Sequence, residues 1–126
     1  MRVLVVDDNR DAADAIALYL TLTGHEVTTA ADGREGLGAA RSAPFDAVVT
    51  DLNMPHMNGD EMIRELRLLV GYAGIPVVII TGSTLKCCQE LCEELSAYGP
   101  LAVRQKPCEM PELLRVIAEL EGGIGV

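Results

Sequence analysis

The sequence has no run of apolar residues approaching the roughly 18 that a membrane-spanning helix needs, so we expect no transmembrane segment. It also lacks the apolar stretch of a secretory signal peptide, because Asp7 and Asp8 interrupt the apolar residues near the N-terminus. No internal repeat, low-complexity segment or linker divides the 126 residues, a length that suits one domain. We therefore expect a cytoplasmic domain over residues 1–121, with residues 122–126 as a C-terminal tail or the start of a linker.

Basic residues are scarce. Ten lysines and arginines stand against 19 aspartates and glutamates, which gives a net charge of −9. This charge repels phosphate backbones and anionic lipids, so nucleic acids and membranes are poor partners for this chain alone. It is compatible with a divalent cation or a basic protein surface. Hydrophobic residues still make up 49% of the chain, which is enough for a full core and excludes disorder throughout.

Five short segments have the composition of β-strands. Three of them, 3–6, 47–50 and 77–81, are continuously apolar, which is typical of strands buried on both faces of a parallel sheet. The other two, 26–30 and 101–104, are more polar and suit the edges of a sheet. Helical patterns occupy five further segments: 12–20, 34–41, 60–70, 84–98 and 110–120. This alternation favours an α/β fold with a parallel sheet built from right-handed crossovers.

Polar residues stand at the carboxyl ends of four of the predicted strands. Asp7 and Asp8 follow the first strand and Asp51 the third, while Thr81 ends the fourth and Lys106 follows the fifth. Ligands bind outside this edge of an open parallel sheet. If the first and third strands are neighbours, the three carboxylates lie close together. Two unit charges about 5 Å apart repel by about 3 kcal/mol at an effective dielectric near 20, so a proton or a cation must offset the repulsion.

Oxygen ligands with room for water favour Mg²⁺ among the cations. Its open positions would accept a phosphoryl oxygen, while Lys106 could neutralise a second oxygen and the Thr81 hydroxyl could bind a third. Covalent transfer to a carboxylate is an established route that needs mainly positioning and charge neutralisation. Each residue alone could instead be structural, since Asp8 or Asn9 could simply cap the first helix. Five such groups together on one edge favour a functional site.

The order and spacing of five short motifs resemble those of the receiver domains of two-component response regulators. The resemblance runs from about Arg2 to Leu120. In chain order the motifs are Val3-Leu4-Val5-Val6-Asp7-Asp8-Asn9, Val48-Val49-Thr50-Asp51-Leu52-Asn53-Met54-Pro55, Met57-Asn58-Gly59, Ile79-Ile80-Thr81-Gly82 and Lys106-Pro107. The resemblance implies a three-layer, doubly wound (βα)5 flavodoxin-like domain with the strand order 2-1-3-4-5 of the chemotaxis receiver. It also implies a cis peptide bond between Lys106 and Pro107.

The resemblance further implies a role for each residue of the site. Asp51 corresponds to the phospho-accepting aspartate, Thr81 to the switch hydroxyl and Lys106 to the phosphoryl-binding lysine. The implied Mg²⁺ ligands are Asp7, usually through water, Asp8, Asp51 and the backbone carbonyl of Asn53. The donor would be a phosphohistidine on a histidine kinase or a histidine phosphotransfer protein, in a two-component system or phosphorelay. Such a domain catalyses its own phosphorylation and dephosphorylation but is mainly a signalling switch that acts on a downstream protein target.

The sequence departs from the family in its last third. Val103 stands where the family usually has a tyrosine or phenylalanine whose ring turns inward during signalling, and valine has no such rotamer change. Cys108 stands where a phenylalanine is common. These residues belong to the surface that the family uses for output, formed by 84–98, 101–104 and 110–120. The resemblance allows a homodimer through this surface, and an alternative function is a protein-interaction module that ignores phosphorylation.

Four cysteines leave a second alternative open. Cys88 and Cys92 lie four residues apart and share one face of a predicted helix, while Cys87 points elsewhere. Reduced thiols are expected in a cytoplasmic domain, and packing is the favoured role for a small apolar side chain. The functional alternative is redox modulation of protein binding on the output surface, which needs an exposed thiol of low pKa.

Overall fold

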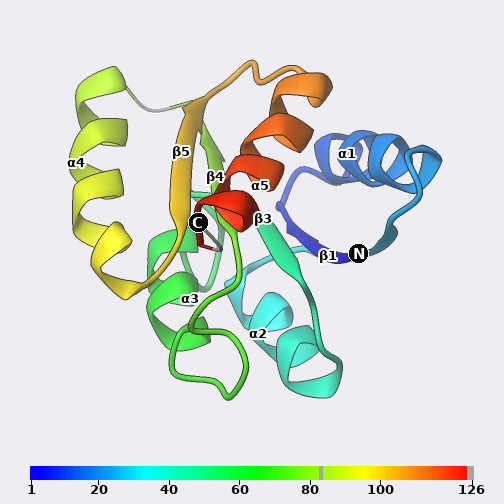
Figure 1. Cartoon of the computed structure of the whole chain (residues 1–126), viewed down its shortest axis with the longest axis horizontal. Helices are drawn as coiled ribbons and strands as arrows, with labels where there is room; N and C mark the ends of the chain where they lie inside the picture. The colour runs from blue at the N-terminus through cyan, green and yellow to red at the C-terminus, as the bar shows by residue number, and fades with distance from the viewer. Residues whose placement is uncertain (83, 125–126) are drawn as a thin grey trace.

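The computed structural model describes residues 1–82 and 84–124, without the side chains of residue 85 and residues 121–124. Its centre is a sheet of five parallel strands in the order β2-β1-β3-β4-β5 (Figure 1). The strands are β1 (Arg2–Val6), β2 (Glu26–Ala30), β3 (Ala47–Asp51), β4 (Val77–Thr81) and β5 (Leu101–Gln105). The predicted strand order is therefore confirmed, and each strand lies within one residue of its predicted bounds.

Helices cover both faces of the sheet. They are α1 (Arg10–Leu22), α2 (Gly33–Ser42), α3 (Gly59–Leu66), α4 (Leu85–Leu95) and α5 (Met110–Ile124), with a 3-10 helix η1 (Ser96–Tyr98) after α4. Buried residues of α1 and α5 form the core on one face, and those of α2, α3 and α4 form the core on the other (Figure 1). This is the predicted three-layer, doubly wound arrangement.

The central strands β1, β3 and β4 are apolar at most positions because both of their faces are covered. Successive side chains of a strand point to opposite faces. In β1, Leu4 and Val6 join the core under α2 and α3, while Val3 and Val5 join the core under α1 and α5. All four side chains are fully buried. The edge strand β2 is mostly exposed, as its polar sequence predicts.

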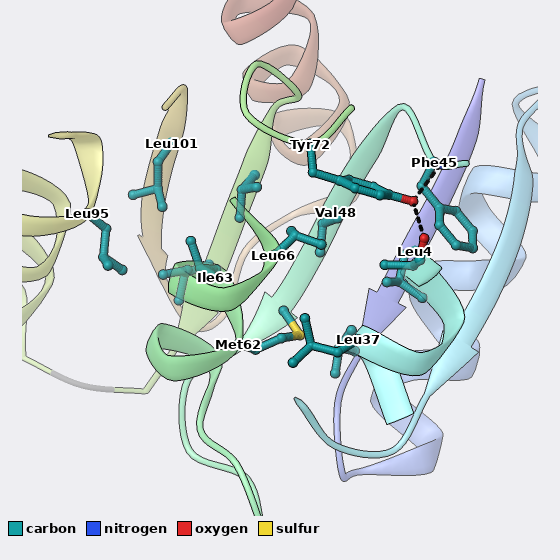
Figure 2. Close-up of a cluster of buried hydrophobic side chains, with 14 of the residues drawn as sticks. Leu4, Leu37, Phe45, Val48, Met62, Ile63, Leu66, Tyr72, Leu95 and Leu101 are labelled. Atoms are coloured by element: carbon teal, nitrogen blue, oxygen red, sulfur yellow. Dashed lines mark hydrogen bonds between the residues drawn. The ribbon is translucent and has the colours of Figure 1, made fainter. Parts of the chain in front are cut away.

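Tyr72 closes the core at the amino edge of the sheet, where the strands begin. Its ring is buried, and its hydroxyl oxygen lies 2.8 Å from the carbonyl oxygens of both Ala40 and Ala43 at the end of α2. The same hydroxyl accepts a hydrogen bond of 3.2 Å from the backbone N–H of Phe45. Figure 2 shows the ring over β3, with the hydroxyl pointing toward Phe45. One phenol thus satisfies backbone groups that would otherwise be buried without partners.

The predicted helix over 60–70 is wrong at its C-terminal end, because α3 stops at Leu66. The chain continues with hydrogen bonds between residues three apart, from the N–H of Leu68 to Glu65 and from that of Leu69 to Leu66. Leu69 still packs against the core, which explains the apolar spacing that misled the prediction. The loop that follows exposes apolar side chains: Leu68 is 84% exposed and Val70 99%.

The last helix extends past its predicted end at residue 120. The backbone of α5 is helical to Ile124, so most of the predicted tail or linker over 122–126 continues the helix. Residues 125–126 lie outside the described residues, and the boundary of the domain remains a prediction. Among the described helices, none is long and apolar enough to cross a membrane.

Candidate functional site

Three carboxylates meet at the carboxyl edge of the sheet. β1 and β3 are neighbours, with Val6 opposite Thr50, so the residues that follow these two strands lie side by side. Asp7, Asp8 and Asp51 each offer an oxygen atom, and these atoms lie within 4.8 Å of one another. In the described part of the chain, no other group of three acidic, histidine or cysteine side chains converges in this way. The predicted juxtaposition is confirmed.

The turn between β1 and α1 holds Asp7 in place. The Asp7 N–H continues the strand ladder by donating to the carbonyl oxygen of Ala30, at 3.0 Å. One carboxylate oxygen of Asp7 accepts a hydrogen bond of 2.9 Å from the N–H of Asn9. Asn9, one of the two candidates for the cap of the first helix, accepts in turn from the N–H of Ala12 at 3.2 Å. Asp8 is exposed and free of the capping role, so its carboxylate is available to a ligand.

The charge on Asp7 is poorly compensated. The side chain is only 6% exposed, and this burial raises the pKa of Asp7 above its usual range. The negative charges of Asp51 and Asp8 raise the pKa further, while the Asn9 N–H and the Lys106 ammonium act in the opposite direction. A raised carboxyl pKa means that the folded protein holds this anion at a cost, which a bound cation would offset.

Lys106 supplies a positive charge to Asp51 itself. Its ammonium nitrogen lies 3.1 Å from one carboxylate oxygen of Asp51, and the other oxygen accepts a hydrogen bond of 2.7 Å from the N–H of Leu52. The Lys106 N–H donates to the carbonyl oxygen of Thr81 at 2.7 Å, which ties the lysine to the end of β4. Thr81 itself is fully buried, and the peptide bond to Pro107 is cis, as the resemblance implies.

The loop after β3 brings α3 against the backbone of Asp51. A Cβ atom on Gly59 would lie 2.2 Å from the Asp51 carbonyl oxygen, so only glycine fits there. The Gly59 N–H donates to the carbonyl oxygen of Leu52 at 2.8 Å, and the Asn58 side chain accepts from the N–H of Met54 at 3.2 Å. These contacts fix where β3 ends. No role for Asn58 or Gly59 was predicted, although an asparagine before a helical pattern is a recognisable signal for a helix start.

Asn53, an implied Mg²⁺ ligand, and Gly82, the last residue of the fourth motif, lie on loops at this edge. Asn53 is exposed, two residues beyond Asp51. Gly82 is exposed too, and a Cβ atom there would meet nothing within 4 Å. Between Asn53 and α3, His56 adopts a positive φ of 66°, with the N–H of Met57 donating to the Pro55 carbonyl at 2.7 Å. The loop therefore contains a tight three-residue turn centred on a residue that is not glycine.

None of the four cysteines belongs to the carboxylate cluster. Cys87 is exposed on α4, Cys88 is buried beneath the helix, and Cys92 and Cys108 are partly buried. Burial raises the pKa of the Cys88 and Cys108 thiols. A raised pKa lowers the fraction of reactive thiolate, so these two residues have the chemistry of packing side chains rather than of redox sensors.

Comparison with known proteins agrees with this geometry. The family model of the response regulator receiver domain matches residues 3–118. A response regulator receiver protein of Anaeromyxobacter is 40% identical over 113 residues, which are 90% of this chain and 45% of that protein. The hybrid signal transduction histidine kinase D of Dictyostelium discoideum is 36% identical over 118 residues, which are 94% of this chain and 7% of the kinase. The chain thus spans less than half the length of either relative.

A solved structure of similar size shows the same fold. The chemotaxis protein CheY4 of Vibrio cholerae superposes with a TM-score of 0.84 and 33% sequence identity, covering 94% of this chain and 97% of CheY4. The match extends over the whole sheet and its helices rather than over one motif. The chain therefore belongs to the response regulator receiver domains of two-component signalling systems.

Proposed function

We propose that this receiver domain takes a phosphoryl group from a phosphohistidine onto Asp51 in a reaction that depends on Mg²⁺, and that the phosphorylated form controls a protein contact. The observation that carries the proposal is the meeting of three carboxylates within 4.8 Å, with the Lys106 ammonium 3.1 Å from Asp51. Structural capping does not account for this arrangement, because Asn9 already caps α1.

The donor atoms at the carboxyl edge fit Mg²⁺. All of them are oxygens, one carboxylate is buried with a raised pKa, and another is exposed so that water can complete the coordination. Mg²⁺ takes one or two carboxylates and keeps several waters. Asp7, Asp8, Asp51 and the backbone carbonyl of Asn53 would hold the ion. When bound, it would neutralise charge on the phosphoryl oxygens.

The residues of the chain itself position the reactants. A carboxylate oxygen of Asp51 forms a bond to phosphorus as the bond to the donor imidazole nitrogen breaks, and that nitrogen then takes up a proton. Lys106 neutralises a second phosphoryl oxygen, and the hydroxyl of Thr81 donates to a third. The Leu52 N–H, already 2.7 Å from the Asp51 carboxylate, keeps the nucleophile oriented.

The donor we propose is a histidine kinase or a histidine phosphotransfer protein, since receiver domains interact with such proteins and one relative is itself a histidine kinase. We assign the receiver domain to residues 1–121 and place it in the cytoplasm. A homodimer through α4, β5 and α5 is a further proposal, and light scattering with and without beryllofluoride would test it.

The test of the proposed function is phosphorylation by acetyl phosphate or phosphoramidate with Mg²⁺, followed by intact mass measurement. We expect one phosphate adduct on the wild-type protein, no adduct on Asp51→Asn, and no adduct after chelation of the metal. Asp46→Asn, at an exposed aspartate on the opposite edge, is the matched control. A folded wild-type protein that never gains the adduct would contradict the proposal.

A second candidate is an interaction module that ignores phosphorylation. Val103 favours it, because this residue is 8% exposed and packs in one core cluster with Cys88 and Leu95 of α4. No aromatic ring is present here to turn inward. Partner capture with and without beryllofluoride separates the candidates, since only the first predicts a change in affinity. The redox-modulated variant needs an exposed thiol, whereas Cys88 is buried and Cys92 partly buried.

A further inference from the structure

Val70 exposes an apolar side chain beside a hollow at the amino edge of the sheet. It belongs to the loop between α3 and β4 and is 99% exposed, although valine is usually buried. The hollow has a volume of about 280 Å³ and is lined by residues 40–45 and 70–72. It lies between this loop and the C-terminal end of α2, which are at the same edge of the molecule in Figure 1. An exposed apolar side chain and a surface hollow therefore lie side by side.

Hydrogen bonds fix the two walls of the hollow relative to each other. The Tyr72 hydroxyl, from the loop, lies 2.8 Å from the carbonyl oxygens of both Ala40 and Ala43 at the end of α2. It also accepts a hydrogen bond from the N–H of Phe45, toward which it points in Figure 2. The hollow is therefore part of the folded structure, and no loop has to be ordered before a side chain can enter it.

Arg67, directly after α3, ties the same loop to the segment before β5. One guanidinium nitrogen donates to the carbonyl oxygens of Tyr72 at 2.8 Å and Ile75 at 2.7 Å, and the other donates to that of Pro100 at 2.7 Å. The Arg67 side chain is buried, and this burial lowers its pKa. Val70 is thus exposed on a loop whose following residues are held by the core.

The exposed face of α2 carries positive charge. Arg34 and Arg41 are exposed and lie seven residues apart with Gly38 between them, so the three residues share one face of the helix. None of the ion pairs among the described residues includes either arginine. A Cβ atom at Gly38 would meet nothing within 4 Å, so the surface between the two arginines is open. This face differs in sign from the chain as a whole, whose net charge is −9.

The nearby acidic side chains do not line the hollow. Glu35, also on α2, lines a separate cavity at the carboxyl edge. Asp46 follows the hollow in sequence and accepts a hydrogen bond of 2.8 Å from the N–H of Arg2. Glu61 and Glu65 are exposed on α3 and lie outside the lining. The charge in the described lining is that of Arg41, which favours an anion at the rim.

We infer that this face of α2 and the hollow beside it form a docking surface for an acidic segment of a partner protein. An apolar side chain of the segment enters the hollow beside Val70, and its carboxylates pair with Arg41 and Arg34. The apolar rim does not suit a nucleic acid, and two copies of a chain with a net charge of −9 repel each other. The volume of about 280 Å³ is below the roughly 300–1,000 Å³ of pockets that enclose small molecules.

Helix geometry sets the spacing that the segment needs. Residues seven apart, such as Arg34 and Arg41, are separated by about 10 Å along a helix axis. An extended peptide covers about 10 Å in three residues. Two acids three residues apart therefore match both arginines. The apolar residue lies beyond the acid that pairs with Arg41, because Arg41 is the arginine that lines the hollow.

An NMR titration of the whole chain with a synthetic peptide tests this surface. The probe is acetyl-Glu-Ser-Ser-Glu-Ser-Phe-amide, and two control peptides replace both glutamates by lysine or the phenylalanine by serine. We expect amide shifts at residues 38–45 and 70–72, with a Kd below about 1 mM for the probe. Both control peptides should bind at least about tenfold more weakly, because each lacks one of the two contacts.

Substitutions of exposed residues separate the two contacts. Arg41→Gln removes the cation of the lining and Val70→Ser the apolar rim, and each should weaken binding of the probe about fivefold. Arg115→Gln, at an exposed arginine of α5, and Leu22→Ser, at an exposed leucine of α1, are the matched controls. Both controls should bind the probe as the wild type does. Asp51→Asn should also bind it unchanged, since the hollow lies at the opposite edge of the sheet.

Absence of shifts at residues 38–45 and 70–72 with about 5 mM probe would overturn the docking surface. Equal binding of either control peptide would overturn it too, as would equal binding of phenylacetate, which would indicate a site for small carboxylates. Shifts of the same amides with protein concentration alone would place a second copy in the hollow and contradict the proposal. The phosphorylation assay at Asp51 is independent of all these results.

Discussion

The two edges of the sheet hold opposite unbalanced charges. At the carboxyl edge, Asp7, Asp8 and Asp51 converge with Lys106 as their nearby cation. At the amino edge, Arg67 is buried, and no described acidic side chain pairs with it. Its two terminal nitrogens donate to three carbonyl oxygens, whereas its Nε has no hydrogen-bond partner among the described residues. The carboxyl edge is open at its carboxylate cluster, because Asp8 and Lys106 are exposed, whereas the amino edge is closed around Arg67, which is buried.

Accessibility decides what each imbalance can do. An anion cluster that solvent can reach is relieved by a cation from solution, which makes it a binding site. The charge of a cation that solvent cannot reach is compensated by hydrogen bonds to fixed backbone carbonyl groups, so the cation has a structural role. An incompletely compensated charge therefore creates a candidate ligand site at the carboxyl edge and a structural contact between loops at the amino edge.

The largest effect should come from Arg67 at the closed edge. Arg67→Met leaves three carbonyl oxygens without their donor, so we expect a loss of about 3 kcal/mol in the free energy of unfolding. Urea denaturation followed by circular dichroism measures this loss. Arg41→Met should change stability by less than about 0.5 kcal/mol, since Arg41 is exposed. Equal stability of the two variants would contradict the structural role of Arg67 at the amino edge.

Tyr72→Phe tests the same edge with a smaller change. The ring stays in place, but the N–H of Phe45 and the carbonyl oxygens of Ala40 and Ala43 lose a partner. We expect a loss of about 2 kcal/mol in the free energy of unfolding, again measured in urea. Tyr98→Phe, at a half-exposed tyrosine of η1, is the control and should have little effect.

Asp7→Asn at the open edge should act in the opposite direction. The amide oxygen of the variant can still accept a hydrogen bond from the Asn9 N–H, while the poorly compensated negative charge is lost. The free energy of unfolding of the metal-free protein should therefore increase by about 1 kcal/mol. Because burial raises the pKa of Asp7 in the folded state, the metal-free wild type should lose stability as the pH rises through that pKa. The variant should lack this dependence. Calorimetry should show that it binds Mg²⁺ more than about tenfold more weakly.

An Asp7→Asn variant that is less stable than the wild type without metal would show that the anion cluster is already compensated. Asp11→Asn, at an exposed aspartate in the first turn of α1, is the control. It should leave both the stability and the affinity for Mg²⁺ near their wild-type values.

The smallest expected effect concerns backbone strain in the loop after β3. His56→Gly should stabilise the protein by about 0.5 kcal/mol, because glycine adopts the positive φ of this residue without a steric penalty but loses more conformational freedom on folding. His56→Ala keeps the penalty and should not stabilise. Thermal denaturation of both variants separates relief of strain from loss of the imidazole. Equal melting temperatures would show that the turn is unstrained.

The sequence predicted the open edge far better than the closed one. Strands and acids could be placed because continuous apolar runs mark buried strands, and Asp7 and Asp51 directly follow two of them. Arg67 gave no such signal, since an arginine within an apolar helical pattern is usually a solvated residue. Its burial depends on the loop after α3 and on the turn at Pro100, which are far apart in sequence.

Lys106 and Asp51 are 55 residues apart in the chain, and their contact exists only once β5 has joined the sheet. A growing polypeptide that has emerged from the ribosome without its last strand has the three acids but not the lysine. Such a fragment lacks the ammonium group that faces Asp51, and so does a chain cleaved by a protease before β5. Under the proposed function, the wide spacing of the site along the chain therefore restricts phosphorylation to molecules whose sheet is complete.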